Sequence, residues 1–393
     1  MRKASPKENL LFLSAHLPAP NATQAGQLTA FRNLDLLHTS YNIHLITFRT
    51  EVESDWSLVP LKERCTQVEV FDVSKRSRAL GALQRPQLPL IIASRASSDF
   101  RRSIETACRT APPARVHMEW TQIAQYKDSL PKNCLQTLSI YDVLTQAAQR
   151  KEQLSARLRK LAYRVEAGRI YAWEKKHLGQ FDKIFVPSAK DRNLYADLGI
   201  ISSDRVAVLP LAFNVIPARA SVPTGPFKIA YWGSYARQEN VDAALFLLDG
   251  VLPALDRLGL KAQVLLIGAN PPPALLRRAS DRVTVTGFVA DPAEMLTSAH
   301  LAVLPLRMGA GVKVKVLECL SGGIPVVTTS TGAEGIACGP EEGLVTVDGT
   351  AEAMARKVWE LAKLPAEIER LSASAAIWAQ KYAATDNTTL LML

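Results

Sequence analysis

Apolar runs alternate with amphipathic stretches along most of the chain. The run 9–15 predicts a buried strand, the stretch 28–40 carries apolar residues at helical spacing, and 42–49 predicts a second strand. A strand, a helix and a strand at this spacing form a βαβ unit, and such units build parallel sheets. The same criterion predicts further strands at 67–73, 115–120, 136–143, 183–188 and 206–210.

The alternation stops at 214–227, where Pro217, Pro223, Pro226 and Gly225 predict a hinge linker. It then restarts, with strands expected at 228–234, 261–269, 282–289, 301–306 and 324–330, and with helices at 240–258, at 291–299 and from about 313. The 393 residues also favour two domains, because single cores rarely grow beyond about 250–300 residues. We therefore predict an α/β fold of two Rossmann-like, doubly wound domains, 1–213 and 228–365, that face a cleft. The amphipathic C-terminal helices, 366–393, are expected to cross back to the first domain.

Ligands of doubly wound folds bind at the carboxyl ends of the strands, so binding residues are expected in the loops that follow strands. Gly233 and Ser234 end the strand 228–234 ahead of a helix, where backbone amides favour an anion. Taken alone, this loop is weak evidence of an anion-binding site, because strand–glycine–helix turns are common.

The stretch 309–318, "GAGVKVKVLE", carries a stronger signal. Gly309 and Gly311 allow a ligand close to the backbone, and Lys313 and Lys315 flank a helix start, where cations are unfavourable unless an anion offsets them. Glu318 lies three residues beyond Lys315 and is expected to project towards the same end. Two cations for a diphosphate and a carboxylate for ribose hydroxyls fit a nucleotide sugar. The alternative is a surface loop followed by a Lys–Glu pair on a helix.

The net charge of +10 is compatible with nucleic acid, an anionic membrane or phosphate-bearing substrates. The sequence shows no RRM, zinc-finger or leucine-zipper pattern, so nucleic acid is not predicted as a partner. Two interpretations compete for the helical stretch 145–180: a packed helix with a solvated basic face, which we favour, or a helix at a membrane surface. Its apolar stripe is Leu154, Leu158, Leu161 and Val165, and its basic face is Arg150, Lys151, Arg157, Arg159, Lys160 and Arg164.

Five scattered cysteines, without a CxxC or Cys/His cluster, argue against a disulfide framework and against zinc, and suit a reducing cytosol. The basic N-terminus before "LLFLSA" superficially resembles a signal peptide, but its apolar run is too short and predicts a first strand instead. No run approaches the length of a membrane span. We therefore expect a cytoplasmic protein, with the inner membrane face as a further candidate location.

The segment 287–336 resembles the donor half of GT-B-fold, family 4-like glycosyltransferases. It contains that family's G-x-G-x-[RK]-x-K-x-x-E element, followed by G-x-P-V-V-x-T and G-x-E-G. The segment 232–255 is similar to the opening of the family's nucleotide domain. The N-terminal half resembles the family more loosely, through 18–27 and 181–191.

The resemblance implies a nucleoside diphosphate-sugar donor in the C-terminal domain and an acceptor at the N-terminal domain. Glu318 would then hold the donor ribose, and Lys313 and Lys315 would hold the diphosphate together with the loop of Gly233, Ser234 and Arg237. The backbone of Phe288 and Val289 would contact the nucleobase. The two lysines would stabilise the leaving diphosphate as fixed positive charge. Backbone amides from Gly309 to Val312 would meet the sugar.

Three departures from the family pattern affect the prediction. Many members carry a carboxylate where this chain has Ala310, so the donor sugar is not predicted. Many also have a His-Asp pair where this chain has Tyr141 and Asp142. Tyr141 can bond a sugar hydroxyl but is no base at neutral pH. Asp142 is a catalytic candidate, with helix capping as the alternative.

Glu119 ends a predicted strand and is an acceptor-site candidate, with core or surface placement as the alternative. Gly26, in the segment 18–27, is a third acceptor-site candidate beside Tyr141. The acceptor itself is expected to be a saccharide or a lipid-linked molecule, in the second case with peripheral membrane contact.

The predicted activity is retaining sugar transfer in bacterial-type polysaccharide or glycolipid synthesis. No D-x-D motif occurs, so neither a metal nor another cofactor is expected. The alternatives are a sugar-nucleotide epimerase of the same fold and an inactive nucleotide-sugar-binding scaffold. A dinucleotide oxidoreductase is disfavoured because neither domain opens with GxGxxG.

Overall fold

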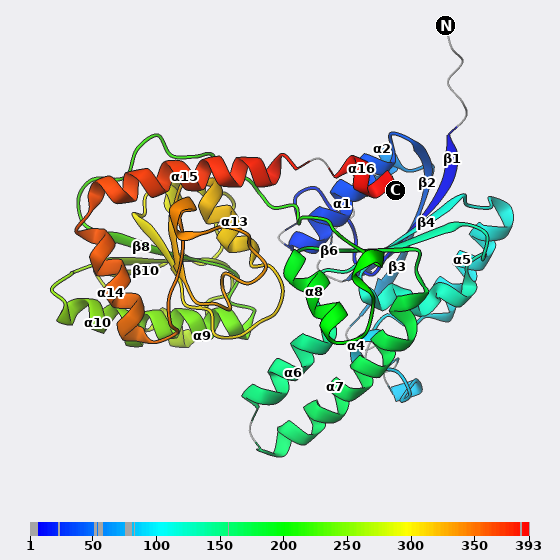
Figure 1. Cartoon of the computed structure of the whole chain (residues 1–393), viewed down its shortest axis with the longest axis horizontal. Helices are drawn as coiled ribbons and strands as arrows, with labels where there is room; N and C mark the ends of the chain where they lie inside the picture. Colours follow the sequence, from blue (N-terminus) through cyan, green and yellow to red (C-terminus); the bar gives the residue numbers. More distant parts are fainter. Residues whose placement is uncertain are drawn as a thin grey trace, which may run out of the picture. The chain divides into compact units, whose positions relative to one another are not determined.

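The computed structural model describes residues 7–22, 24–50, 53, 58–74, 81, 83–155, 157–385 and 387–392. It divides into two compact units: unit 1 is Met1–Ala212 with Asp386–Leu393, and unit 2 is Phe213–Thr385 (Figure 1). The predicted linker 214–227 lies at the start of unit 2 and is tied to it. The backbone N–H of Ile216 donates to Ser321 Oγ at 2.9 Å, and Arg219 Nε donates to Ser372 Oγ at 3.0 Å.

Unit 1 is built on a seven-stranded parallel sheet in the order β3-β2-β1-β4-β5-β6-β7. Leu10–Leu13 of β1 are essentially inaccessible because β1 is central and helices cover both faces of the sheet. The strands are β1 Glu8–Ser14, β2 Tyr41–Thr50, β3 Gln67–Val73, β4 Arg115–Glu119, β5 Leu135–Ser139, β6 Lys183–Val186 and β7 Val206–Val208. The helices are α1 Ala25–Leu37, α2 Val59–Arg64, α4 Leu90–Ala93, α5 Ser98–Thr110, η2 Thr121–Ser129, α6 Leu144–Leu154, α7 Arg157–His177, η3 Leu178–Gln180, α8 Ala189–Asp197, η4 Ser203–Arg205 and α16 Thr388–Met392.

Unit 2 is built on a six-stranded parallel sheet in the order β10-β9-β8-β11-β12-β13. The strands are β8 Lys228–Trp232, β9 Gln263–Ile267, β10 Val283–Val285, β11 Leu301–Leu304, β12 Val326–Thr328 and β13 Leu344–Thr346. The helices are α9 Gln238–Phe246, η5 Leu247–Val251, α10 Leu252–Arg257, α11 Pro273–Leu276, α12 Ala293–Thr297, α13 Val314–Ser321, η6 Pro340–Glu342, α14 Ala351–Ala362 and α15 Pro365–Ala383.

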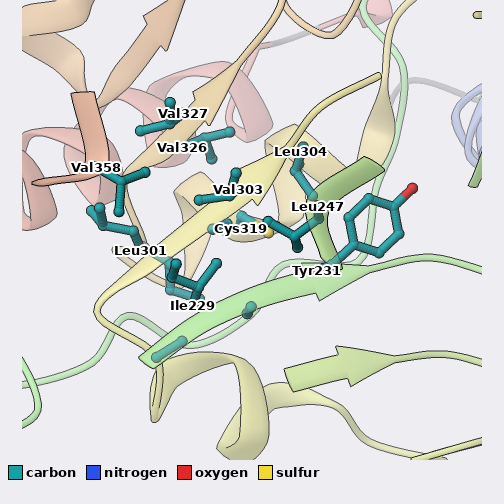
Figure 2. Close-up of a cluster of buried hydrophobic side chains, with 14 of the residues drawn as sticks. Ile229, Tyr231, Leu247, Leu301, Val303, Leu304, Cys319, Val326, Val327 and Val358 are labelled. Carbon is teal, nitrogen blue, oxygen red and sulfur yellow. The ribbon is translucent and has the colours of Figure 1, made fainter. Parts of the chain in front are cut away.

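The core of unit 2 lies between this sheet and its helices. Figure 2 shows Ile229 of β8 and Val303 of β11 in one cluster with Leu247 of η5, Cys319 of α13 and Val358 of α14. Cys319 and Val358 are fully buried, as are the three others. This packing fixes the start of α13 relative to the ends of β8 and β11.

The fold class predicted from the sequence is confirmed: both units are α/β structures around a parallel sheet. Several elements differ in extent. The predicted strands 136–143 and 282–289 are shorter, since β5 ends at Ser139 and β10 at Val285. The short edge strand β13 and the helices α5 and α14 were not predicted.

The predicted long helix 145–180 is two helices, α6 and α7, which pack against each other as a hairpin (Figure 1). The expectation that its apolar stripe is packed is wrong at two positions: the side chains of Leu161 and Val165 are 66% and 57% exposed. Tight burial in α7 begins only at Ala167, because the first half of α7 lies beyond the sheet. The side chains of Leu154, Arg157 and Leu158 lie outside the described part of the structure.

The C-terminal helices divide between the units. Most of the predicted segment 366–393 is α15, which belongs to unit 2 and packs against α13. Only α16 packs in unit 1, where Leu391 is fully buried in the same cluster as Leu34 and Leu37 of α1. No helix in the described ranges combines the length and apolar character needed to cross a membrane.

Candidate functional site

In each unit the strand order reverses direction at one point: between β1 and β4 in unit 1, and between β8 and β11 in unit 2. Open α/β folds bind ligands at the carboxyl edge of the sheet at such a reversal point, between the loops that follow the two strands. In unit 2 the loops are 233–237, after β8, and 305–313, after β11. They contain most of the predicted donor residues.

Gly233 has φ of 151° and its Cα lies directly against Lys315. A Cβ added at Gly233 would lie 2.6 Å from Lys315 Nζ and 3.0 Å from Asn240 Nδ2. Only glycine therefore lets the Lys315 amine reach the end of β8. The close approach of the β8 loop and the α13 lysine was predicted from sequence only through the family resemblance.

Lys315 is mostly enclosed by unit 2. Its Nζ donates to Asn240 Oδ1, lies 3.5 Å from the Tyr231 hydroxyl, and sits 5.2 Å from the centre of the Tyr231 ring. Burial lowers the Lys315 pKa to about 7; Glu239 opposes this shift and Arg237 adds to it. None of the ion pairs between described residues includes Lys315. The site therefore holds a buried amine that no carboxylate of the described residues contacts as an ion pair, although Glu239 and Glu318 lie near enough to interact with its charge.

Glu318 lies one turn further along α13 and accepts a hydrogen bond from Trp232 Nε1 at 2.6 Å. Burial raises the Glu318 pKa to about 7, while the Trp232 bond, the Lys315 charge and the backbone N–H of Asn214 favour the carboxylate. The carboxylate retains acceptor capacity beyond its bond to Trp232, which a pair of ribose hydroxyls can use.

Lys313 is the residue that precedes α13, and its amine turns back onto its own loop. It donates to the carbonyls of Gly311 at 2.6 Å and Ala310 at 3.1 Å, and lies 4.0 Å from Glu334 Oε2. Gly309 and Gly311 have positive φ values of 114° and 70°, which a side chain would strain. Lys313 is thus less available than Lys315, because it already balances Glu334. Val312 packs partly against the core.

The other predicted donor residues surround this centre at varying distances. Ser234 and Arg237 are exposed in the loop after β8, which Asn240 fixes by donating from Nδ2 to the Ser234 carbonyl at 2.6 Å. Phe288 and Val289 follow β10, two strands away from β8, and the Phe288 side chain is 73% exposed while Val289 packs partly on the core. No hydrogen bond or ion pair between described residues joins these two to Lys315 or Glu318.

In unit 1, Glu119 is the last residue of β4 and is completely buried. Its carboxylate accepts from Asn33 Nδ2 at 2.9 Å and from the Tyr141 hydroxyl at 2.7 Å, and lies 3.0 Å from His117 Nε2. Burial raises the Tyr141 pKa well above its ordinary value, and Glu119 raises it further, so Tyr141 remains a protonated donor. The structure thus joins two acceptor-site candidates, Glu119 and Tyr141, directly.

Gly26 and Asp142 flank this pair. A Cβ on Gly26 would lie 2.9 Å from Trp120 Cζ2, so this glycine makes room for the indole beside Glu119. Asp142 is exposed, next to Tyr141 in the loop after β5. The residue that caps α6 is Val143, without a side-chain cap bond.

Several residues of these centres were not assigned from the sequence: Tyr231, Trp232, Asn240 and Glu334 in unit 2, and Asn33, His117 and Trp120 in unit 1. A signal existed for Glu334, which stands in the G-x-E-G motif, and for Asn240, which stands in the segment 232–255 that resembles the family. For Asn33 there was none, because its partner Glu119 is 86 residues away. Within the described ranges, no group of three or more His, Cys, Asp or Glu side chains is arranged to hold a metal ion.

Residues 226–363 match the family model of glycosyl transferases group 1. No curated protein matches the sequence. Sucrose-phosphate synthase from Thermosynechococcus elongatus is similar in structure, with a TM-score of 0.70 and 14% identity over 98% of this chain and 97% of that one.

Two further solved structures share the fold. HepE from Anabaena, in complex with UDP and glucose, has a TM-score of 0.63 and 14% identity over 98% of this chain and 100% of that one. The lipopolysaccharide outer core galactosyltransferase WaaB has a TM-score of 0.58 and 12% identity over 98% and 100%. The chain therefore has the GT-B fold of glycosyltransferases, and the greater part of its second unit matches the group 1 glycosyl transferases.

Proposed function

We propose that the chain transfers a sugar from a nucleoside diphosphate-sugar bound in unit 2 to a saccharide or lipid-linked acceptor, with retention of configuration. Lys315 and the loop of Gly233, Ser234 and Arg237 would hold the diphosphate, and Glu318 would hold the ribose. Lys313 would act from the edge of the site, and the backbone of Phe288–Val289 would meet the base. The proposed chemistry uses no metal, since protein cations take that role.

The observation that carries this proposal is the Lys315 amine at the reversal point of the unit 2 sheet. It is largely buried, its pKa is lowered to about 7, and it forms none of the ion pairs between described residues. A diphosphate supplies the missing negative charge, and bond breakage at the sugar increases the charge on that diphosphate. Lys315 therefore stabilises the leaving group more strongly in the transition state than in the bound substrate.

The nucleotide class is supported by HepE, which has the same fold and binds UDP and glucose. Glu318 is placed one helical turn after Lys315, on the same helix, which suits a ribose next to a diphosphate. Because Ala310 provides no side-chain acceptor for sugar hydroxyls, the backbone between Gly309 and Val312 would contact the sugar.

A lipid-linked acceptor is supported by the α6–α7 hairpin. We name the hairpin patch after its exposed or half-exposed residues Arg159, Lys160, Leu161, Arg164 and Val165. Leu161 and Val165 are exposed apolar side chains, and three cations lie within the same two turns, of which Arg164 pairs with Glu152 at 2.8 Å. Such a helix can enter the headgroup region of an anionic bilayer, where a cation near the surface adds about 1 kcal/mol.

Incubation of the chain with a panel of nucleotide sugars tests the function. We expect hydrolysis of at least one donor in the absence of acceptor, and faster donor consumption when a suitable acceptor is added. Conversion of a nucleotide sugar into an isomer, with no sugar released, would identify an epimerase instead. Nucleotide binding without any turnover would identify a scaffold.

A further inference from the structure

The strand order of unit 1 reverses between β1 and β4, and an aromatic cluster occupies that point. His16 follows β1, Trp120 follows β4 and Tyr141 follows β5. The indole of Trp120 contacts both other rings at tilted angles, with centroid distances of 4.8 Å to His16 and 4.8 Å to Tyr141. All three side chains are partly exposed, so the cluster forms part of the surface at the carboxyl edge of the sheet.

The backbone of Trp120 adopts φ 69° and ψ 143°, a conformation that bulky residues rarely accept. Neighbouring contacts hold it there: its N–H donates to the Ser139 carbonyl at 2.9 Å, and its carbonyl accepts from the Ile123 N–H at 3.1 Å. Gly26 leaves the space that the indole fills. Such strain persists where the surroundings enforce it, and it is commonest at functional sites.

Core packing explains this arrangement only in part, because Trp120 packs against the core of unit 1 and yet remains partly exposed. Trp173, which is fully part of the same core, is only 6% exposed and lies in the regular helix α7. Trp120 adopts an unfavourable backbone conformation and keeps part of its indole exposed at the carboxyl edge of the sheet. The feature therefore indicates contact with a ligand that has a flat apolar face.

Tyr141, whose ring contacts the indole, connects it to further polar groups. Tyr141 borders a small pocket with Asn33, Thr29 and Ser139. Asn33 is 1% exposed and its Oδ1 finds no donor among the described residues, although its Nδ2 is bonded to Glu119. An unpaired buried acceptor is costly, so a hydroxyl that enters this pocket gains a bond that the protein alone does not supply.

We propose that Trp120 is the stacking surface for a sugar ring of the acceptor, with Asn33 Oδ1 and the Tyr141 hydroxyl accepting hydrogen bonds from its hydroxyl groups. The C–H face of a pyranose is flat and apolar, while its rim carries the hydroxyls, which matches an indole next to Tyr141 and to the pocket that Tyr141 and Asn33 line. This inference rests on the proposed sugar transfer and deepens it, because it assigns the acceptor to the saccharides or glycolipids with a ring at the acceptor end.

The test is binding of the full chain to an array of mono- and oligosaccharides, with four variants. Trp120→Leu should weaken every saccharide bound by the wild type at least about 10-fold, while Trp120→Phe should stay within about 3-fold. Gly26→Ala should also weaken binding, because its methyl group displaces the indole. Trp359→Leu, at a partly buried tryptophan of unit 2, is the matched control and should bind like the wild type.

UDP titration and thermal melting of each variant check that the fold is intact. If Trp120→Leu fails to fold, the saccharide affinities of Gly26→Ala and Trp120→Phe still test the role of the indole. The inference is overturned if the wild type binds no saccharide, or if Trp120→Leu and Gly26→Ala bind as the wild type does. Failure of the proposed function would show separately, as a wild type that neither binds nor consumes a nucleotide sugar.

Discussion

Replacement of Lys315 by methionine should stabilise unit 2 and abolish nucleotide binding at the same time. Methionine has a similar length and is unbranched, so it fills the same space beside Gly233. Asn240 Oδ1 keeps a second donor, the Tyr231 hydroxyl at 3.2 Å, and is not left unpaired. The change therefore removes a buried charge without opening a cavity or stranding a polar group.

The expected gain in the free energy of unfolding follows from the Lys315 pKa, which falls from 10.5 in the unfolded chain to about 7 in the folded one. A shift of that size corresponds to about 5 kcal/mol of unfavourable charge burial at acidic pH. The lost bond to Asn240 and the remaining solvent contact reduce the expected net gain to about 1–3 kcal/mol. For a domain of this size that is a rise in melting temperature of roughly 2–12 °C.

The pH dependence has a definite sign. Between pH 7 and 10.5 the unfolded chain binds more protons at this lysine than the folded one, so its contribution makes wild-type stability rise with pH in that window. The advantage of Lys315→Met should thus be largest below pH 7 and should disappear near pH 10.5.

Thermal unfolding at pH 6 and pH 9, with and without UDP, measures both effects. We expect Lys315→Met to melt above the wild type, by a larger margin at pH 6, and UDP to raise only the wild-type transition. Lys381→Met, at an exposed position of α15, is the control and should change neither quantity. A Lys315→Met chain that melts below the wild type, or that UDP stabilises equally, would refute the assignment of a buried, anion-seeking lysine.

Three further predictions concern the remaining groups. Glu318→Ala should weaken UDP binding about 10- to 100-fold in calorimetry, because a charge-assisted hydrogen bond is lost; unchanged affinity removes Glu318 from the site. Lys313→Met should cost more affinity for UDP than for uridine, and equal losses would contradict a role at the diphosphate. Replacing the three cations of the hairpin patch with Gln should reduce co-sedimentation with anionic vesicles, which should also fall with added salt; salt-independent binding or none argues against membrane contact there.

The alternating fold was predictable because central parallel strands must be apolar on both faces and so leave unmistakable runs. Leu10–Leu13 and Val326–Val327 are such runs, and all are buried. The placement of Gly309 beside Lys313, and of Lys315 and Glu318 on the helix that follows, was also predictable, because these residues are close in sequence around one helix start. The spacing of residues along the chain was sufficient to predict both the central strands and the residues around this helix start.

Contacts set by sheet order were not predictable in this way. Trp232 reaches Glu318 across 86 residues, and Trp120 meets His16 and Gly26 only because β4 lies beside β1. Periodicity also fails to show whether anything covers an apolar stripe. Leu161 and Val165 have the spacing of a packed helix face, yet they are exposed because the described part of the sheet ends short of them.

Proton uptake on nucleotide binding is the most direct test of the proposal that Lys315 binds the diphosphate of the donor. Titration calorimetry of the wild type with UDP, GDP and ADP at pH 8, in two buffers of different ionisation enthalpy, measures it. At that pH Lys315 is mostly neutral and Glu318 mostly ionised, since both have a pKa of about 7, so a bound diphosphate should draw close to one proton onto Lys315. We predict this uptake for the tightest nucleotide and its loss in Lys315→Met. Binding without uptake, uptake that persists in Lys315→Met, or no binding of any diphosphate would contradict the proposal.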